Sequence, residues 1–444
     1  MKNRIKQYLL AASMCVGLTA CSDFFEPIPG VQFGLDETFA SKQRTEEYLN
    51  NVYSYVREVT DAIHPNTYGG IFTEASLDGA NRWNKTYAEW TNGSFNSASA
   101  QASEYFSKYY QAIAKASTFI QNVDKCTEAA ASTRGKWKSE ARALRAYYYF
   151  ELLRLYGPIP LIGEDPIPLD ASLEELIKER NSVDECVNFI ATELQSAIDS
   201  GDLLQRAGKA NLGRMDVATC MALKAKLYLY WASPLFNGNT DQASVKNKDG
   251  RQLFPQTEDN SKWAQARDAY ERFMTFATGQ GYKLTEVYTN GKLDPYASCR
   301  AAGEFFTTTW EAVDELIFVK LRDLYDYTYW VCPKFTDFQD TDVTGGGGYY
   351  TTQETVDLFF TKDGLTIEED PGYDKFEGIP SANNFTSGRY YDPNNPSRLY
   401  FDADKSKVLK QWKDREPRFY VNITYSGSIW LNEGKYNEEM RTDF

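Results

Sequence analysis

The chain contains one histidine, His64, among its 444 residues. Histidine is the usual general base and a common metal ligand near neutral pH, so one histidine beside Pro65 argues against a Ser-His-Asp triad and a histidine-based metal site. The sequence also lacks the G-x-S-x-G and H-E-x-x-H patterns and shows no EF-hand loop. We therefore identify no catalytic residue, no metal ligand and no cofactor site.

Cysteines are few, and their spacing does not suggest pairing. Two of the seven lie near the start of the chain, at Cys15 and Cys21, and the other five are Cys126, Cys186, Cys220, Cys299 and Cys332. Five is an odd number, and no two of them have C-x-x-C spacing, which argues against a disulfide framework and a structural zinc site. We expect these five side chains to be buried as small apolar groups.

Positive charge is in deficit. The chain has 48 Lys and Arg against 62 Asp and Glu, a formal net charge of −14. Such a protein repels phosphate backbones, which argues against a nucleic-acid partner. It also repels anionic lipid headgroups, so attachment to a membrane would have to come from covalent lipid.

Long apolar runs are missing as well, apart from a short one near the start. Three basic residues among the first six precede an apolar run at 8–18, which is shorter than the roughly 20 residues that span a bilayer. Leu18-Thr19-Ala20-Cys21 follows. This pattern is typical of a bacterial lipoprotein export signal. We predict removal of residues 1–20 and acylation of the Cys21 sulfur by more than one chain, since each buried methylene contributes only about 0.8 kcal/mol. The alternative is an ordinary export signal with an incidental cysteine.

Helical periodicity dominates residues 40–280. Apolar residues recur there at steps of three and four, which is typical of amphipathic helices. Gly157-Pro158 would end the third helix, and Ser182 with Glu185 would form a capping box before the fourth. The fourth and fifth helices begin about 32 residues apart, close to the tetratricopeptide period, which favours stacked helical pairs. The six stripes fall at 48–59, 106–120, 141–155, 183–198, 218–232 and 263–277.

The character of the chain changes after residue 280. Residues 281–350 mix aromatic, acidic and glycine residues, and the run Gly345–Gly348 lacks the pattern of a phosphate-binding loop. Long loops of this kind often carry binding function. We therefore divide the chain after the export signal into a helical region at 21–280 and a loop-rich region at 281–444, joined in one structural unit.

Several segments, in order, resemble one known family. SEARALRAYYYFELLRLYGPIPLI (139–162) resembles the signature segment of SusD/RagB-type nutrient-uptake lipoproteins. CSDFFEP (21–27), NSVDECVNFIATELQSAI (181–198), YYTTQETVDLFFTKDGLTI (349–367) and DREPRFYVNITYSGSIW (414–430) are similar to its other landmarks. Glu416-Pro417 departs from the more usual Asp-Pro. Family members usually continue past the position of Phe444, so we expect a truncated or a naturally short member. We interpret 139–162 as scaffold and 415–418 as a structural ion-pair turn.

The resemblance implies a mainly α fold with tetratricopeptide-like helical pairs, long aromatic-rich loops and a few short strands. It implies a lipid-anchored protein on the exterior of the outer membrane, partnered with a SusC-like TonB-dependent barrel transporter. Such proteins capture oligosaccharides for import and catalyse no reaction.

Aromatic rings among hydrogen-bonding groups mark the candidate sugar-binding residues. Glycans present apolar C–H faces and hydroxyls, so a site needs flat rings with polar neighbours. Stacking contributes roughly 1–3 kcal/mol per ring, by analogy with base stacking. The alternative is that these rings are buried beneath long loops. Glu315-Leu316-Ile317-Phe318, within the second cluster, resembles a core strand of the family. The first cluster is Arg82, Trp83, Asn84, Tyr87 and Trp90; the second is Tyr288, Tyr296, Trp310, Tyr327 and Trp330.

Three alternatives remain open on sequence alone. The cargo could be a peptide or glycopeptide captured in the same way. From a different class, the chain could be a surface glycoside hydrolase, which needs two facing carboxylates; 62 acidic residues provide such pairs by chance. An adhesive or structural surface protein would predict β-rich modules instead of six amphipathic helices.

Overall fold

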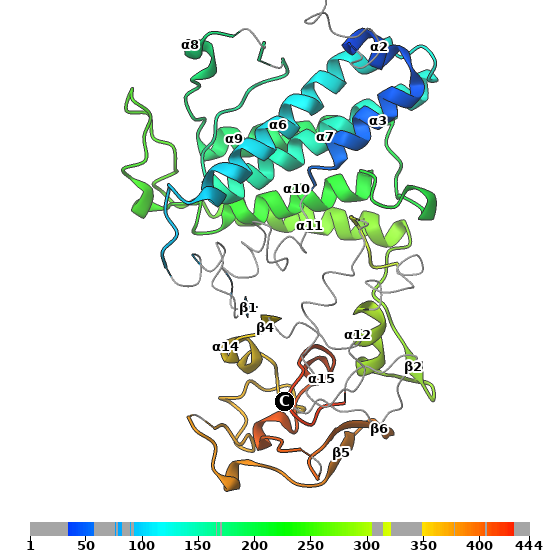
Figure 1. Cartoon of the computed structure of the whole chain (residues 1–444), viewed down its shortest axis with the longest axis vertical. Coiled ribbons are helices and arrows are strands. Elements are labelled where there is room, and N and C mark those ends of the chain that lie inside the picture. Colours follow the sequence, from blue (N-terminus) through cyan, green and yellow to red (C-terminus); the bar gives the residue numbers. More distant parts are fainter. Residues whose placement is uncertain are drawn as a thin grey trace, which may run out of the picture.

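The computed structural model of the chain describes residues 34–56, 76, 79–81, 89, 93–165, 167–168, 171–303, 314–320, 349–376, 378–404 and 406–429. Figure 1 shows long helices in one half of the molecule, and short helices, strands and loops in the other. Among these residues, no helix combines the length and apolar character needed to cross a membrane. The predicted mainly α fold with a few short strands is confirmed.

Helices account for most of the regular structure. The helical half contains α2 (Leu35–Ala40), α3 (Lys42–Tyr53), α6 (Ala100–Asn122), α7 (Ala131–Tyr156), α8 (Leu173–Leu176), α9 (Val183–Asp199), α10 (Val217–Ala232) and α11 (Ser261–Gly279). The second half contains α12 (Pro295–Gly303), α14 (Gln353–Asp357) and α15 (Pro417–Asn422). Short 3₁₀ turns lie at Val123–Lys125, Lys209–Asn211, Thr240–Gln242, Ala382–Asn384 and Lys410–Trp412.

The strands are short and antiparallel. Three two-stranded ladders are described: β1 (Ala80–Asn81) with β4 (Tyr349–Tyr350), β2 (Tyr288–Thr289) with β3 (Lys292–Leu293), and β5 (Arg389–Asp392) with β6 (Asn395–Asp402). The β5–β6 register shifts on both sides of Tyr391. The β1–β4 ladder joins segments far apart in the chain, whereas the other two are hairpins.

Helix ends follow the predicted signals. The capping box before α9 forms, with the Ser182 hydroxyl accepting from the Glu185 amide at 3.3 Å and the Glu185 carboxylate accepting from the Ser182 amide at 2.8 Å. Gly157 ends α7 at φ 69°, a left-handed conformation that favours glycine. All six predicted helices are present, although α3 ends at Tyr53 and its predicted last residue, Val59, lies outside the described residues.

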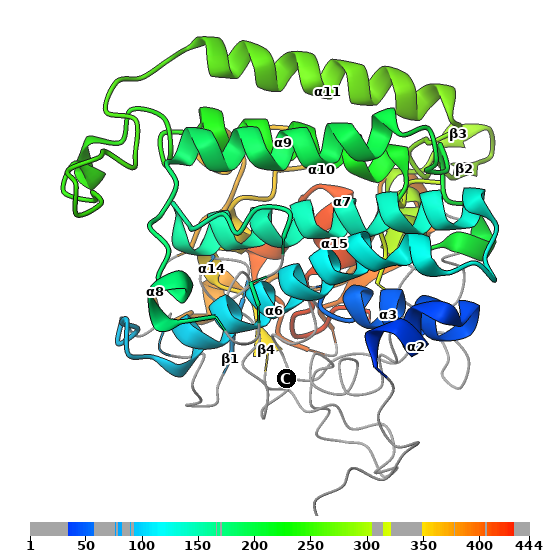
Figure 2. The same cartoon turned by 90° about the horizontal axis from the view of Figure 1, so that it is seen from above.

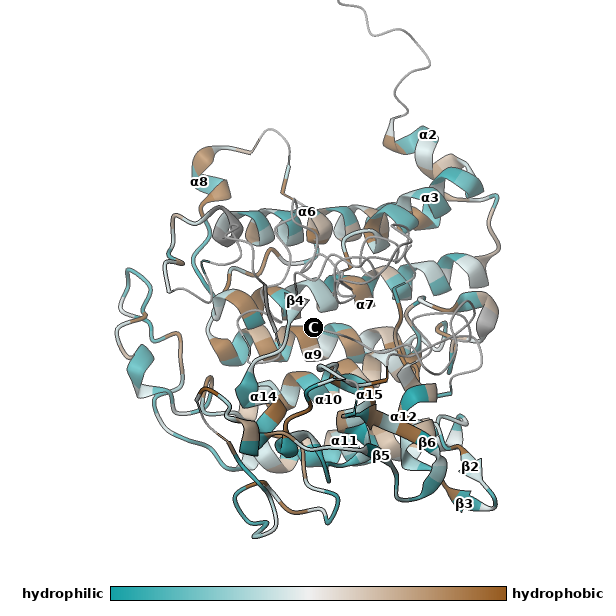
Figure 3. Ribbon diagram, turned by 60° about the horizontal axis from the view of Figure 1, so that its bottom comes forward, coloured by the Kyte–Doolittle hydropathy of each residue, from teal (hydrophilic) through white to brown (hydrophobic). Residues whose placement is uncertain are grey.

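The long helices pack in sequence order. α6 packs on α7, α7 on α9, α9 on α10 and α10 on α11, as Figure 2 shows from above. The first residues of α9 and α10, Val183 and Val217, are separated by one tetratricopeptide period of about 34 residues. Figure 3 shows hydrophobic residues along α7, α9 and α10.

The signature segment at 139–162 is scaffold, as predicted. Nearly every α7 side chain from Ser139 to Leu153 is buried. Arg145 is fully buried and donates to Glu193 on α9 at 2.8 Å and to Ser117 on α6 at 3.0 Å. A buried guanidinium needs such partners, so this residue ties three helices together.

The second half has its own smaller apolar core, which we call the C-terminal cluster. Within it the rings of Tyr400 and Tyr420 stack with centroids 3.9 Å apart. Arg415 lies beneath it and donates to the carbonyls of Val356 and Phe359, both at 2.7 Å. Arg418 pairs with Glu416 at the start of α15, which confirms the structural turn predicted at 415–418. The cluster consists of Val356, Tyr400, Phe401, Val408, Phe419, Tyr420 and Tyr425.

The strand that the family resemblance implied at Glu315–Phe318 does not form. The segment forms turns and bends, and its backbone bonds to other elements instead of to a neighbouring strand. The Ile317 carbonyl accepts from the Thr219 hydroxyl at 3.3 Å, and Phe318 packs against the helical core. The segment is thus part of the core, but not as a strand.

The cysteines behave largely as expected. Cys126, Cys186 and Cys220 are buried free thiols, and Cys299 is half-buried. Burial raises the pKa of the Cys186 thiol to about 12, so it stays protonated. Cys332 and the predicted lipidation site, Cys21, lie outside the described residues.

Candidate ligand-binding site

The β1–β4 ladder joins the start of the first predicted cluster to the end of the loop-rich stretch at 281–350. Ala80 pairs with Tyr350, and Asn81 pairs with Tyr349. The first predicted cluster begins immediately after Asn81, and the second predicted region leads through Gly345–Gly348 directly into Tyr349. Segments more than 250 positions apart therefore adjoin the same short ladder, which sequence spacing alone could not indicate.

Most of the predicted ligand-binding residues remain predictions. Arg82, Trp83, Asn84, Tyr87 and Trp90 lie outside the described residues. So do three of the second cluster: Trp310, Tyr327 and Trp330. Only Tyr288 and Tyr296 can be located.

Glu89 is a candidate that the residue-by-residue sequence reasoning missed. It lies between Tyr87 and Trp90, and its backbone carbonyl accepts from the Phe95 amide at 3.1 Å. Its Oε2 atom is buried and, among the residues that the structure describes, has no hydrogen-bond partner. A desolvated carboxylate oxygen without a donor is unfavourable, and a sugar hydroxyl is a donor that would satisfy it. The only signal in the sequence is an acid among tryptophans and tyrosines.

Tyr288 is exposed on a protruding hairpin. Asn290 and Gly291, with φ of 53° and 78°, form the tight turn between β2 and β3. Tyr288 pairs with Leu293 across the ladder, and its side chain is 60% exposed. Its hydroxyl donates to Glu286 at 2.9 Å, and this hydrogen bond raises the tyrosine pKa. The ring is available for stacking, as a sugar-binding tyrosine must be.

Tyr296 has a different environment. It lies on α12 and packs against the C-terminal cluster, with its ring centroid 5.5 Å from that of Tyr400. The Arg398 guanidinium lies over the ring at 4.3 Å, a cation–π distance. The ring therefore contributes to packing between α12 and the β5–β6 hairpin, and its predicted ligand contact stays a prediction.

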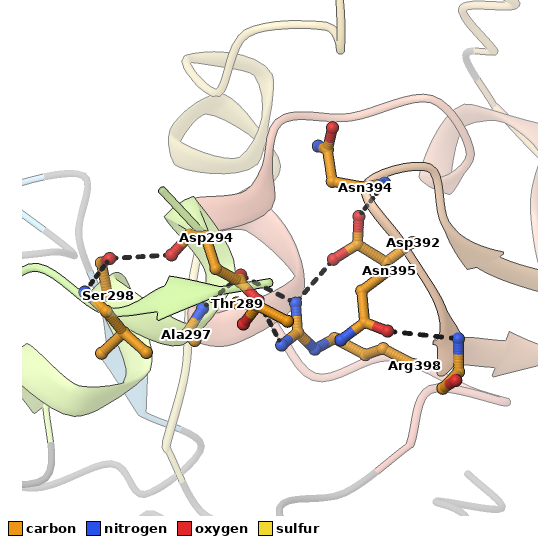
Figure 4. Close-up of polar contacts among 10 residues, drawn as sticks. Thr289, Asp294, Ala297, Ser298, Asp392, Asn394, Asn395 and Arg398 are labelled. Atoms are coloured by element: carbon orange, nitrogen blue, oxygen red, sulfur yellow. Dashed lines mark hydrogen bonds and ion pairs between the residues drawn. The ribbon is translucent and has the colours of Figure 1, made fainter. Parts of the chain in front are cut away.

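A polar network fixes the base of the β2–β3 hairpin. Figure 4 shows Arg398 between two carboxylates, where it donates to Asp294 at 2.9 and 2.8 Å and to Asp392 at 2.7 Å. Asp294 also accepts from the Thr289 hydroxyl and the Ala297 amide, both at 2.9 Å. The hydrogen bonds from Arg398 lower the pKa of Asp294 to about 2. Asp294 thereby links the hairpin, the start of α12 and strand β6.

The two located regions are separate. In Figures 1 and 2 the β1–β4 ladder and the β2–β3 hairpin lie on different sides of α15. Neither holds a group of three or more histidine, cysteine or acidic side chains arranged for a metal ion, within the part of the chain that the structure describes. Both offer aromatic rings and polar groups, which suits binding of a polar, ring-shaped ligand.

Comparison with known families gives two matches. The family model described as "Starch-binding associating with outer membrane" matches residues 32–229, and the "SusD family" model matches residues 315–443. Together they cover well over half of the chain. A "SusD-like protein" of Bacteroides ovatus is 27% identical over 175 residues, covering 38% of this chain and 30% of that protein.

Solved structures agree on the fold. The protein named BT4246 is 23% identical, with a TM-score of 0.70 over 88% of this chain and 66% of its own. A SusD-like protein of Bacteroides fragilis is 20% identical, with a TM-score of 0.61 over 89% of this chain and 64% of its own. The chain thus spans less than two thirds of the length of these proteins, and at this identity the likeness establishes the fold.

Proposed function

Because the chain belongs to the SusD family, we propose that it captures oligosaccharides outside the cell and delivers them to a TonB-dependent barrel transporter without catalysis. The observation that supports this proposal is the β1–β4 ladder, which pairs Asn81, just before the 82–90 cluster, with Tyr349, at the end of the 281–350 stretch. A glycan needs several rings and polar groups together, and separate segments can supply them only if the fold brings their ends together.

The family description supports a carbohydrate cargo. It names starch binding and association with the outer membrane. A "SusD-like carbohydrate binding protein" of Bacteroides fragilis has a related fold, with a TM-score of 0.56 and 17% identity. We propose that the rings of Trp83, Tyr87 and Trp90 stack on the sugar and that Arg82, Asn84 and Glu89 bond its hydroxyls.

Membrane attachment through Cys21 is part of the same proposal. The acidic chain would be repelled by anionic headgroups, so two or more acyl chains on the Cys21 sulfur would supply the affinity. We place the protein on the exterior face, where it can meet cargo too large to diffuse through the membrane.

Electrostatics favour binding over hydrolysis at the best-formed carboxylate pair. A glycosidase needs one carboxyl that stays protonated near neutral pH. Asp294 and Asp392 both bond to Arg398, and the pKa of Asp294 is lowered to about 2. Asp294 is therefore ionised at neutral pH and unsuited to act as a general acid.

The test is calorimetric titration of the purified protein with a panel of soluble oligosaccharides, followed by a reducing-end assay. We expect saturable binding in the micromolar to millimolar range and no new reducing ends. Trp83→Ala with Trp90→Ala should weaken binding by about tenfold or more, since each stacked ring contributes roughly 1–3 kcal/mol. Trp263→Ala is the control, because Trp263 is 41% exposed on α11 in the helical half.

Three outcomes would contradict the proposal. Steady release of reducing ends would show a hydrolase. Binding of peptides in place of sugars would change the cargo class but keep the delivery role. Unchanged sugar binding in the double tryptophan variant would show that Trp83 and Trp90 do not form the binding surface.

A Cys21→Ser variant tests the location. It should leave the membrane fraction and no longer co-purify with a barrel protein.

A further inference from the structure

Three neighbouring helices form a small groove in the helical half, away from the β1–β4 ladder and the β2–β3 hairpin. Its cavity is about 210 Å³, and its lining comes from α9, α10 and α11. Figure 2 shows these three helices side by side. Each contributes two residues one turn apart, one polar and the other apolar: Gln195 with Ile198, Lys224 with Met221, and Arg272 with Ala269.

The polar part of the groove carries two positive charges and no lining carboxylate. Lys224 donates to the Gln195 amide oxygen at 2.7 Å. The Gln195 amide nitrogen in turn donates to Asp199 at 2.7 Å, so Gln195 connects the lysine to Asp199. Arg272, in the part of the chain that the structure describes, makes no hydrogen bond or ion pair. Its guanidinium donors are therefore available.

The two charges act on each other. Burial lowers the pKa of Lys224, the nearby Arg272 charge lowers it further, and Asp199 opposes both. Tyr228 lies beside the same pair, because the Lys224 ammonium is 6.0 Å from its ring centroid. Lys224 is half-buried and Arg272 is exposed. Two cations that share one groove are mutually unfavourable, and an anion placed between them would relieve this cost.

Arg272 is exposed, and its surroundings differ from those of four less exposed arginines in the helical half. Arg142, Arg145, Arg154 and Arg214 all pair with glutamates. The chain carries a formal charge of −14, so carboxylates are abundant. Unlike these four arginines, Arg272 lines its groove without a paired carboxylate among the described residues.

We propose that this groove binds a single oxyanion group, a carboxylate, sulfate or phosphate, between Lys224 and Arg272. The guanidinium supplies a planar fork of donors and the ammonium a compact charge, the usual pair for such groups. The cavity is smaller than the roughly 300–1,000 Å³ of drug-sized sites, which suits one small charged group. Met221 and Ile198 would contact the apolar part of the molecule that bears the oxyanion group. The site shares no residue with the proposed sugar-binding surface and does not depend on it.

The test uses inorganic sulfate as the probe. Thermal unfolding of the purified protein is measured against sulfate concentration, with sodium chloride holding the ionic strength constant. We expect a saturable rise in melting temperature with a midpoint on the order of millimolar. Arg272→Gln and Lys224→Gln should each shift that midpoint about tenfold or more, as expected for loss of a charge-assisted hydrogen bond.

Arg267→Gln is the matched control. Arg267 lies on the same helix, is exposed and pairs with Asp268 instead of facing the groove. The Arg267→Gln substitution removes one positive charge from α11, as Arg272→Gln does, so a general effect of charge would appear in both variants. Equal midpoints in Arg272→Gln and Arg267→Gln would overturn the proposal, as would the absence of saturable stabilisation by any oxyanion.

The source of the oxyanion is separated by three further probes. Glucuronate is compared with glucose, inorganic phosphate with chloride, and vesicles containing anionic phospholipid with vesicles of neutral phospholipid. Arg272-dependent binding of glucuronate supports an acidic sugar, and Arg272-dependent binding of anionic vesicles supports a lipid headgroup. If only free phosphate or sulfate binds, the site serves small inorganic ions.

Discussion

Arg398 donates two parallel hydrogen bonds to the carboxylate of Asp294, at 2.9 and 2.8 Å, across 104 positions of sequence. The guanidinium is mostly buried, with 18% of the side chain exposed, and it also bonds to Asp392. Two-pronged pairs of this kind fix geometry as well as charge. They set the position of the β2–β3 hairpin, and therefore of Tyr288, relative to the C-terminal cluster.

Replacing Arg398 with methionine should destabilise this half of the molecule. The substitution leaves two buried carboxylates without their cation, and breaking a buried pair in this way costs about 3–5 kcal/mol. Urea unfolding gives the total, and hydrogen exchange at residues 289–298 shows where protection is lost. Arg267→Met is the control, because its exposed pair contributes about 1 kcal/mol or less. Equal effects of the two variants would show that the network is not stabilising.

Stability should fall with acid in a window set by Asp294. Its pKa is about 2 in the folded state, against an ordinary value of 3.8, so the unfolded chain binds the proton first as the pH falls. The contribution is therefore complete above about pH 5 and is lost progressively towards pH 2. Denaturant titrations from pH 6 to pH 2 should show a shallower decline for Asp294→Asn than for the wild type. Parallel curves would contradict the assignment.

The long helices were predictable because their signals are local. An apolar stripe, a capping box at Ser182 and Glu185, and a left-handed glycine at 157 each act within one or two turns. The strand at Glu315–Phe318 was implied by the family resemblance and does not form; an apolar run of this kind also fits a buried irregular segment. Its actual partners, such as Thr219, are distant in sequence.

Gly213 is a position where that distant docking can be tested. Its φ is +84°, and a Cβ there would lie 2.7 Å from the Val319 carbonyl oxygen. Gly213→Ala should lower the free energy of unfolding by about 1–3 kcal/mol more than a glycine substitution in open space. Gly250→Ala is the matched control, with a φ of +86° and nothing within 4 Å of the added Cβ. If both variants lose the same free energy of unfolding in chemical denaturation, the 314–320 segment moves away from the added Cβ at no cost in stability.

Glu89 should show opposite effects on binding and stability. Its buried Oε2 atom lacks a partner within the described part of the chain, so Glu89→Met removes an unsatisfied acceptor and should leave the free energy of unfolding unchanged or raise it. The same change removes an acceptor for sugar hydroxyls and should weaken oligosaccharide binding. Thermal unfolding and calorimetry on one preparation measure both. A loss of stability with unchanged affinity would assign Glu89 to the fold alone.

The sequence predicts a chemistry for the candidate site but could not predict its assembly. Rings among polar residues at 82–90 and 288–330 indicate a sugar-binding surface by composition. Composition could not separate exposed Tyr288 from Tyr296, which packs beneath Arg398. Nor could it indicate that Asn81 and Tyr349 pair, since register between distant strands depends on the whole fold.

The β1–β4 ladder consists of only two residue pairs, and so short a ladder contributes little stability by itself. After β4 the chain passes within three residues into α14, which packs on the C-terminal cluster through Val356. The β4 strand is thus anchored by structure outside the proposed binding segments. On the proposed function, substitutions in those segments can change the ligand while this anchoring structure is kept.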